Sequence, residues 1–266
     1  MRSDWSYDSI ADDYNRVLAP RLFEAPARDL IAAVGIDGAR LVLDVGTGTG
    51  RVASAAQQGL ADRGSVLGLD RSLPMLRFGR ENGVRMAVVA HVPGIPFPPG
   101  SFDVVVSGFV ISHFGDHRAA LLDMVRVIRP GGRLGASAWQ ASDDEFMRAW
   151  KEVARSFVDL DRVGAAAQEA IPGEERFSRP EKLRASFEEA GLHRVSVEPR
   201  SYRYSMSIDE FLHIQEYRAT GRLMRERVGE DAWRRFRDQI AATFRARFRP
   251  PVEYTRQALI AVGVKP

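Results

Sequence analysis

Short apolar runs rich in β-branched residues alternate with stretches of helical periodicity along most of the chain after residue 40. Runs of this kind are typical of parallel strands that helices cover on both faces. Because helices or crossovers connect them, we expect an open, doubly wound α/β sheet. The last strand follows Pro250 and Pro251 closely, so we expect it to be antiparallel. The seven expected strands are residues 41–45, 65–69, 85–90, 103–109, 133–138, 193–204 and 254–262.

The segment before the first strand has helical spacing. Its apolar and aromatic positions are Tyr7, Ile10, Ala11, Tyr14 and Val17. This spacing predicts a helix that stops at Pro20, and a second helix from Pro26 to Val34. Residues 1–36 are therefore expected to form an N-terminal helical cap.

Two polar, arginine-rich helical regions, residues 141–175 and 205–249, interrupt the alternation of strands and helices. The second begins with Ser207 and Glu210 at the spacing of a capping box. We expect the two regions to form one helical lid. The remaining residues, 37–140, 176–204 and 250–266, are expected to form the α/β core.

The composition fits a globular chain of enzyme size. Of its 266 residues, 45% are hydrophobic and 27% are charged, which supports a buried core. The net charge of +3 gives no reason to expect a nucleic-acid partner. The absence of cysteine excludes disulfides, thiolate zinc sites and cysteine nucleophiles, and the scattered histidines predict no metal site. No apolar run approaches the ~20 residues of a membrane span, so we expect a cytoplasmic protein without a membrane partner.

The strongest motif is the run from Leu41 to Gly50, LVLDVGTGTG, a buried strand that enters a glycine-rich turn. Dinucleotide enzymes place G-x-G-x-x-G at this point, but here the third glycine comes one position early and Arg51 follows it. Asp44 lies two residues before Gly46, where an acid would repel a pyrophosphate. It would suit a ligand with positive charge, such as the sulfonium and ammonium groups of S-adenosylmethionine.

A second acid, Asp70, ends the second strand, 70 − 50 = 20 residues after Gly50. A carboxylate at this place can accept hydrogen bonds from both ribose hydroxyls of an adenosine cofactor.

With these residues the chain resembles the class I S-adenosylmethionine-dependent methyltransferases, in particular the small-molecule group that includes quinone-biosynthesis C-methyltransferases. Three more segments carry the resemblance: Asp70–Leu76, Pro96–Val105 and Arg126–Gly132. It runs from about Tyr7 to Trp139 and implies a Rossmann-like, seven-stranded sheet. It also implies that S-adenosylmethionine is the cofactor, with S-adenosylhomocysteine as product. The residues that it assigns to the cofactor are Tyr14, Asp44, Gly46, Thr47, Gly48, Gly50, Asp70, Arg71, Met75, His91, Val92 and Ser107.

One of these residues departs from the family pattern. The family usually has an acid after the third strand that accepts from the adenine amino group, and this chain has His91 there. A neutral imidazole can accept one hydrogen bond. Either His91 replaces the acid, or it lies in a solvent-facing loop and Val92 alone lines the adenine.

His113 is the candidate catalytic residue, because it follows the fourth strand at the edge where open α/β sheets bind ligands. Related enzymes often have two histidines here, and Ser112 replaces the first. His113 is either a general base or a residue that supports the structure or positions the acceptor.

Further candidates for acceptor binding are Tyr7 in the N-terminal helix and Trp139 at the end of the fifth strand. No acid accompanies Trp139, which favours an apolar or aromatic acceptor. Arg218, Arg222 and Arg225 have the spacing of one helix face and could hold a carboxylate or phosphate, although such a stripe is usually a solvated face.

The leading interpretation is an enzyme that methylates an oxygen, a nitrogen or an activated carbon of a small molecule by in-line displacement. An alternative is a methyltransferase-like protein that binds the cofactor structurally without transferring a methyl group. Methylation of nucleic acid is disfavoured, because the chain has no base-flipping motif and no basic arm. A homodimer is compatible with the sequence.

Overall fold

The computed structural model describes residues 6–141 and 143–266. Their contacts divide the chain into two units. The first unit holds the described residues up to Gln140, together with Gly173–Tyr202 and Gln257–Pro266. The second unit holds Ala141–Pro172 and Arg203–Arg256.

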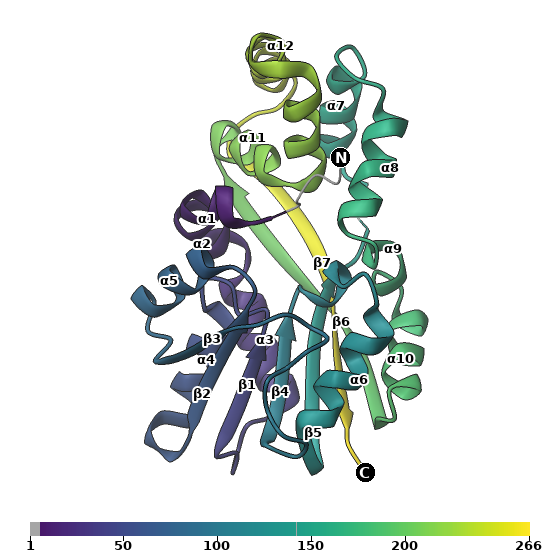
Figure 1. The fold of residues 1–266 in the computed structure, drawn as a ribbon. Helices are drawn as coiled ribbons and strands as arrows, with labels where there is room; N and C mark the ends of the chain where they lie inside the picture. Colours follow the sequence, from purple (N-terminus) through teal and green to yellow (C-terminus); the bar gives the residue numbers. More distant parts are fainter. Residues whose placement is uncertain (1–5, 142) are drawn as a thin grey trace. The chain divides into compact units, whose positions relative to one another are not determined.

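The first unit is built on the sheet that the sequence predicts, with strand order β3-β2-β1-β4-β5-β7-β6 (Figure 1). The strands β3, β2, β1, β4 and β5 pair in parallel, and β7 pairs with β5 in antiparallel register. The predicted α/β sheet with an antiparallel last strand is therefore confirmed. The strand bounds are β1 Leu41–Val45, β2 Ser65–Asp70, β3 Met86–Val89, β4 Phe102–Gly108, β5 Ile128–Trp139, β6 His193–Met206 and β7 Val252–Val264.

Alternate residues of each central strand enter two different cores, because successive side chains of a strand point to opposite faces. Val42, Val104 and Val106 pack with α3 and α4 on one face. Leu43 and Val105 pack with α6 and α10 on the other. Burial on both faces explains the continuous apolar runs in the sequence. The helices of this unit are α3 Glu24–Val34, α4 Arg51–Leu60, α5 Leu73–Glu81, α6 His117–Val127, α9 Glu174–Phe177 and α10 Pro180–Glu189, with short 3-10 turns η3 Ala61–Arg63 and η4 Ile111–His113.

The N-terminal helix does not stop at Pro20, which corrects the expectation from the sequence. The Ala19 N–H bonds to the Tyr14 oxygen, five residues back, at the end of a π-helical stretch. Pro20 then lies in the first turn of the next helix, where its missing N–H is not needed. The chain leaves the helix only near Phe23. The segments are η1 Asp8–Ile10, α1 Ala11–Asp13, η2 Tyr14–Leu18 and α2 Ala19–Leu22.

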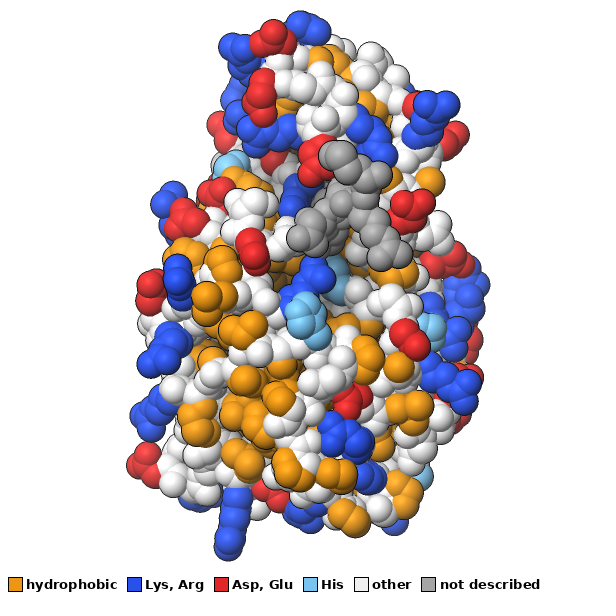
Figure 2. Space-filling model, in the orientation of Figure 1, with side chains coloured by type: hydrophobic (Ala, Val, Ile, Leu, Met, Phe, Trp, Pro, Cys, Tyr) orange, Lys and Arg blue, Asp and Glu red, His pale blue; other side chains and the backbone are white. Residues whose placement is uncertain are grey.

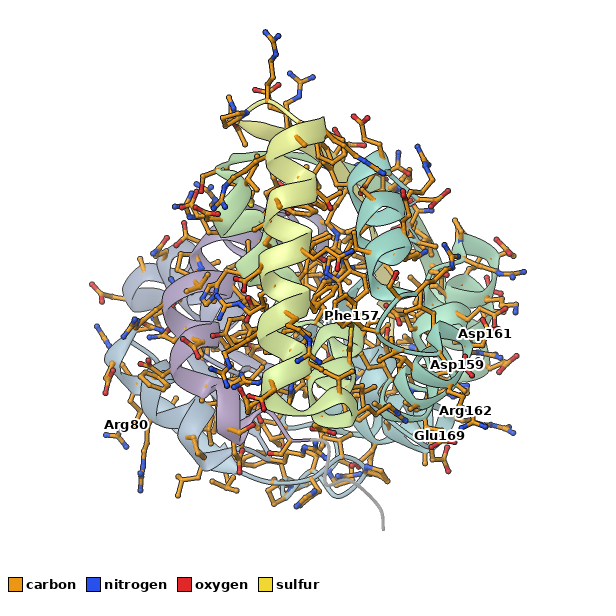
Figure 3. The ribbon with its side chains drawn as sticks, turned by 90° about the horizontal axis from the view of Figure 1, so that it is seen from above. Arg80, Phe157, Asp159, Asp161, Arg162 and Glu169 are labelled. Carbon is orange, nitrogen blue, oxygen red and sulfur yellow. The ribbon has the colours of Figure 1, made fainter. Side chains whose placement is uncertain are left out.

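The second unit is mainly helical. Ser207 and Glu210 form the predicted capping box at the start of α11. The long α12 changes direction at Gly229, where φ is 75°. Asp161, Arg162 and Glu169 are exposed on α8 (Figure 3), whereas Val163 is buried. The helices are α7 Glu145–Ala154, α8 Leu160–Ala170, α11 Ile208–Tyr217 and α12 Ala219–Arg247.

Basic and acidic side chains are interspersed on the face that Figure 2 shows. In the described part of the chain, no helix is long and apolar enough to cross a membrane. Within the same residues, no group of three or more histidine or acidic side chains is arranged to hold a metal ion.

Candidate functional site

The glycine-rich turn after β1 is fixed by the end of β2. Backbone N–H groups of Gly46 and Thr47 donate to the oxygen of Leu69 at 2.7 and 2.9 Å. Gly46, Gly48 and Gly50 all have positive φ, which glycine adopts without strain.

These three glycines serve two purposes. A Cβ on Gly46 would lie 2.5 Å from the Val110 side chain, and a Cβ on Gly50 would lie 2.4 Å from that of Val84. At both positions, the absence of a side chain allows a valine side chain to pack directly against the backbone of the turn. A Cβ on Gly48 would meet only the Gly46 oxygen, at 4.0 Å, so the backbone at Gly48 is open to a ligand.

Asp44 is buried at the end of β1, with 1% of its surface exposed. The Thr47 hydroxyl donates to its Oδ2 at 2.7 Å. Its Oδ1 is buried and has no hydrogen-bond partner among the described residues. Burial raises the pKa of Asp44 to about 7, although the hydrogen bond from Thr47 and the nearby backbone N–H of Ala53 act to lower it. A buried carboxylate oxygen without a partner is costly, and a cationic group beside it would relieve that cost.

Asp70, at the end of β2, faces the same turn. Its Oδ2 accepts from the Gly48 N–H at 2.8 Å, and its Oδ1 accepts from the Ser72 N–H at 2.9 Å. Burial raises the pKa of Asp70, although these two hydrogen bonds act to lower it. Each carboxylate oxygen can accept a second bond, so Asp70 can still receive two ligand hydroxyls. The orphaned oxygen of Asp44, the open Gly48 and the free lone pairs of Asp70 together fit S-adenosylmethionine.

Aromatic side chains of the N-terminal segment lie against this region. Tyr14 stacks on Phe23, with ring centroids 5.7 Å apart, and meets Tyr7 edge-on at 5.8 Å. Burial, followed by the proximity of Tyr7 and Asp70, raises the pKa of Tyr14 far above its usual range. Its hydroxyl therefore stays protonated and can act as a hydrogen-bond donor.

His113 ends the short turn η4 after β4. Its Nε2 lies 3.4 Å from the Tyr7 hydroxyl, and the two rings are edge-on at 5.5 Å. Burial, together with the nearby charge of Arg71, lowers the pKa of His113 to about 4. The imidazole is therefore neutral at physiological pH and can accept a hydrogen bond, but it is a weak base.

A group of aromatic rings lies at the ends of β4 and β5. Phe109 stacks on Trp139, with centroids 4.3 Å apart, and Phe23 packs against both. Tyr202 meets Trp139 edge-on and donates to Asp29 at 2.9 Å. Phe109 has a φ of 61°, which is costly for a bulky residue and is most often retained at functional sites.

The remaining sequence candidates of the first unit lie in different environments. His91 is exposed after β3, and Val92 is half-buried beside it. Met75 is buried in α5. Ser107 is buried in β4, and its hydroxyl has no hydrogen-bond partner among the described residues. The cofactor roles of these residues stay predictions.

Arg218 is the N-cap residue of α12, and Arg222 and Arg225 lie within this helix. Arg218 donates to Gln215 Oε1 at 3.1 Å. Arg222 is half-buried in α12, whereas Arg225 is exposed and pairs with Glu230 at 2.9 Å. Acceptor binding by Arg218 and Arg222 stays a prediction.

Three features were missed by the sequence reasoning. Phe109 and Phe23 were not singled out, because nothing in their neighbourhood marks a positive φ or a shared cluster. Asn82, whose amide contacts the glycine-rich turn, follows a helix and looks there like an ordinary cap.

Comparisons with known proteins agree with this geometry. Residues 43–136 match the family model described as a methyltransferase domain, and this range contains the turn, Asp44, Asp70 and His113. This part of the chain is therefore similar to a methyltransferase domain. Over 137 residues the chain is 30% identical to the demethylmenaquinone methyltransferase of Anoxybacillus flavithermus, covering 48% of this chain and 58% of the relative.

A second relative is the ubiquinone/menaquinone biosynthesis C-methyltransferase UbiE of Cupriavidus taiwanensis. It is 32% identical over 132 residues, which cover 48% of this chain and 51% of the relative. The chain thus spans only about half the length of the relatives that it matches. Among solved structures, the phosphoethanolamine N-methyltransferase 2 of Haemonchus contortus in complex with S-adenosyl-L-methionine gives a TM-score of 0.57 at 16% identity. The match covers 100% of this chain and 58% of that one, and it extends the methyltransferase likeness to the fold.

Proposed function

We propose that this chain is an S-adenosylmethionine-dependent methyltransferase that methylates an oxygen, nitrogen or activated carbon of a small apolar or aromatic molecule. The observation that carries the proposal is the buried Oδ1 of Asp44, which has no partner among the described residues and lies in the turn next to the open backbone of Gly48. The names of the relatives support it, since both describe methyltransferases and one describes C-methylation in quinone biosynthesis.

Each acid has a role in holding the cofactor, which supplies a methyl group on an electrophilic sulfonium. Asp44 Oδ1 accepts from the cofactor ammonium group. Asp70 accepts from the ribose hydroxyls with the lone pairs that Gly48 and Ser72 leave free. The two carboxylates also place negative charge beside a cationic ligand, which favours the cationic substrate over its neutral product.

His113 is proposed to position the acceptor by accepting a hydrogen bond. The lowered pKa of His113 keeps its imidazole neutral at neutral pH. One ring nitrogen then has a lone pair that can accept a hydrogen bond from the substrate. The same low pKa makes it a poor proton acceptor, since general bases work best with a pKa near the working pH. The proposal therefore favours acceptors that are already ionised or electron-rich, for which alignment supplies most of the rate.

The stacked Phe109 and Trp139 favour a planar acceptor and help to keep water from the reacting methyl group. We further propose that residues 141–175 and 205–249 act as the acceptor lid. The cytoplasmic location and the homodimer stay predictions.

Two measurements test the proposal. Calorimetry should detect S-adenosylhomocysteine binding to the wild-type chain. Incubation with S-adenosylmethionine carrying a deuterated methyl group, followed by mass spectrometry, should then show labelled product from a panel of phenols, quinols and aromatic amines. Binding without transfer to any acceptor would favour the alternative of a cofactor-binding scaffold, and the absence of binding would overturn both.

A further inference from the structure

Asn82, directly after α5, binds two distant segments of the first unit through one amide. Its Nδ2 donates to Asn15 Oδ1 at 2.7 Å and to the Thr49 backbone oxygen at 2.8 Å. An amide nitrogen has two hydrogens, so both are used. The backbone of Asn82 is also held, because its N–H donates to the Phe78 oxygen at 2.9 Å and its oxygen accepts from the Ser54 hydroxyl at 3.1 Å. Asn82 is thus a fixed bridge.

One end of this bridge is the glycine-rich turn. Thr49 lies between Gly48 and Gly50 and is buried, with 1% of its surface exposed. The last part of α5 touches the same turn, since a Cβ on Gly79 would lie 3.3 Å from the Gly48 oxygen. By holding the Thr49 carbonyl, Asn82 fixes the orientation of the peptide that follows the open position at Gly48.

The other end of the bridge is the N-terminal segment, Asp8–Leu18. Asn15 directly follows Tyr14 in the π-helical stretch, and local π-helical turns often occur at functional sites. This segment has a second anchor, because Asp8 Oδ1 accepts from the Ser72 hydroxyl at 2.5 Å. Ser72 in turn donates its N–H to Asp70. The N-terminal segment is therefore tied both to the turn and to the loop that holds Asp70.

We propose that Asn82 is a positioning residue that joins the N-terminal segment to the glycine-rich turn, so that a ligand that fixes the turn also orders Asp8–Leu18. This inference rests on the proposed function, because it needs a ligand at Gly48. If ligand binding at the turn favours ordering of the N-terminal segment, ordering of that segment must favour ligand binding to the same extent. Releasing the N-terminal segment from Asn82 must therefore weaken binding of the cofactor.

The test compares two substitutions of Asn15. Asn15→Asp keeps an oxygen that can accept from Asn82, whereas Asn15→Leu has a similar size and no acceptor. One neutral hydrogen bond corresponds to about a threefold to tenfold change in equilibrium, so Asn15→Leu should weaken S-adenosylhomocysteine binding by this factor. Asn15→Asp should bind within about twofold of wild type. Asn82→Ala, which loses both contacts, should weaken binding more than Asn15→Leu.

Hydrogen exchange gives a readout that a purely structural contact would not change. Adding S-adenosylhomocysteine should slow exchange of residues 8–18 in wild type and Asn15→Asp, and should slow it much less in Asn15→Leu. The inference is overturned if Asn15→Leu melts at a lower temperature yet matches wild type in affinity and ligand-induced protection. It is also overturned if Asn15→Asp binds as weakly as Asn15→Leu. A wild-type chain that binds no S-adenosylhomocysteine would instead overturn the proposed function.

Discussion

Replacing Asp44 with asparagine should make the stability of the unliganded protein less sensitive to a rise in pH. Burial raises the pKa of Asp44 from 3.8 to about 7. The folded chain therefore holds this proton more tightly than the unfolded chain does. The contribution of this carboxyl to the free energy of unfolding is fully present below its unfolded-state pKa. That contribution is lost as the pH rises through about 7.

The size of the effect follows from the two pKa values. Between about pH 5 and about pH 8, this carboxyl costs the wild-type protein about 2–3 kcal/mol of unfolding free energy. Asparagine does not ionise, and its oxygen can still accept from Thr47. Any cost of burying its N–H group is the same at both pH values. The difference between variant and wild type should therefore shift by about 2–3 kcal/mol toward the variant as the pH rises.

Urea unfolding of both proteins at the two pH values, without ligand, measures this shift. Asp103→Asn in β4 is the matched control. Although burial acts to raise it, the pKa of Asp103 is held below its usual range by Arg129 and by the backbone N–H groups of Leu41 and Arg40. Its loss should cost stability about equally at both pH values. If Asp44→Asn and wild type instead change in parallel with pH, Asp44 does not carry the raised pKa, and the argument from its orphaned oxygen fails.

Substitutions at three further positions test the site. His113→Gln keeps a hydrogen-bond acceptor and should retain turnover within about tenfold of wild type. At saturating cofactor, the wild-type rate should show no inflection near pH 6.5. A loss of turnover of about 100-fold or more would instead assign His113 as a general base. Phe109→Gly should be more stable to denaturant than Phe109→Ala by about 1 kcal/mol, because glycine adopts the positive φ without strain. Both variants should lose affinity for the methyl acceptor. Equal stability of the two variants would mean that the backbone at this position is not strained. Asp70→Asn should weaken S-adenosylhomocysteine binding by about tenfold or more in calorimetry, and unchanged affinity would remove Asp70 from the site.

The central part of the fold could be predicted because the central strands β1, β4 and β5 are buried on both faces. This burial leaves continuous apolar runs, so the residues from Leu41 to Val45 were identified with their observed bounds. The sequence also predicted that Asp44 and Asp70 serve the same ligand. The structure agrees in placing both at the ends of the parallel strands β1 and β2, at one edge of the sheet.

Other features depend on contacts between residues far apart in the chain. A helix through Pro20 needs the preceding π-helical stretch, which has no sequence signal of its own. Phe109 adopts a positive φ while its ring is packed between Phe23 and Trp139, and such packing cannot be read from neighbouring residues. The lowered pKa of His113 likewise arises from burial in the folded chain and from the nearby Arg71.

A crystal structure of the wild-type chain with S-adenosylhomocysteine tests the central claim most directly. The account predicts the ligand ammonium group within hydrogen-bond distance of Asp44 Oδ1, the ribose hydroxyls on Asp70, and the vacated methyl position toward the side of His113 and Phe109. A ligand bound elsewhere, or bound at the turn with Asp44 Oδ1 still without a partner, would contradict it.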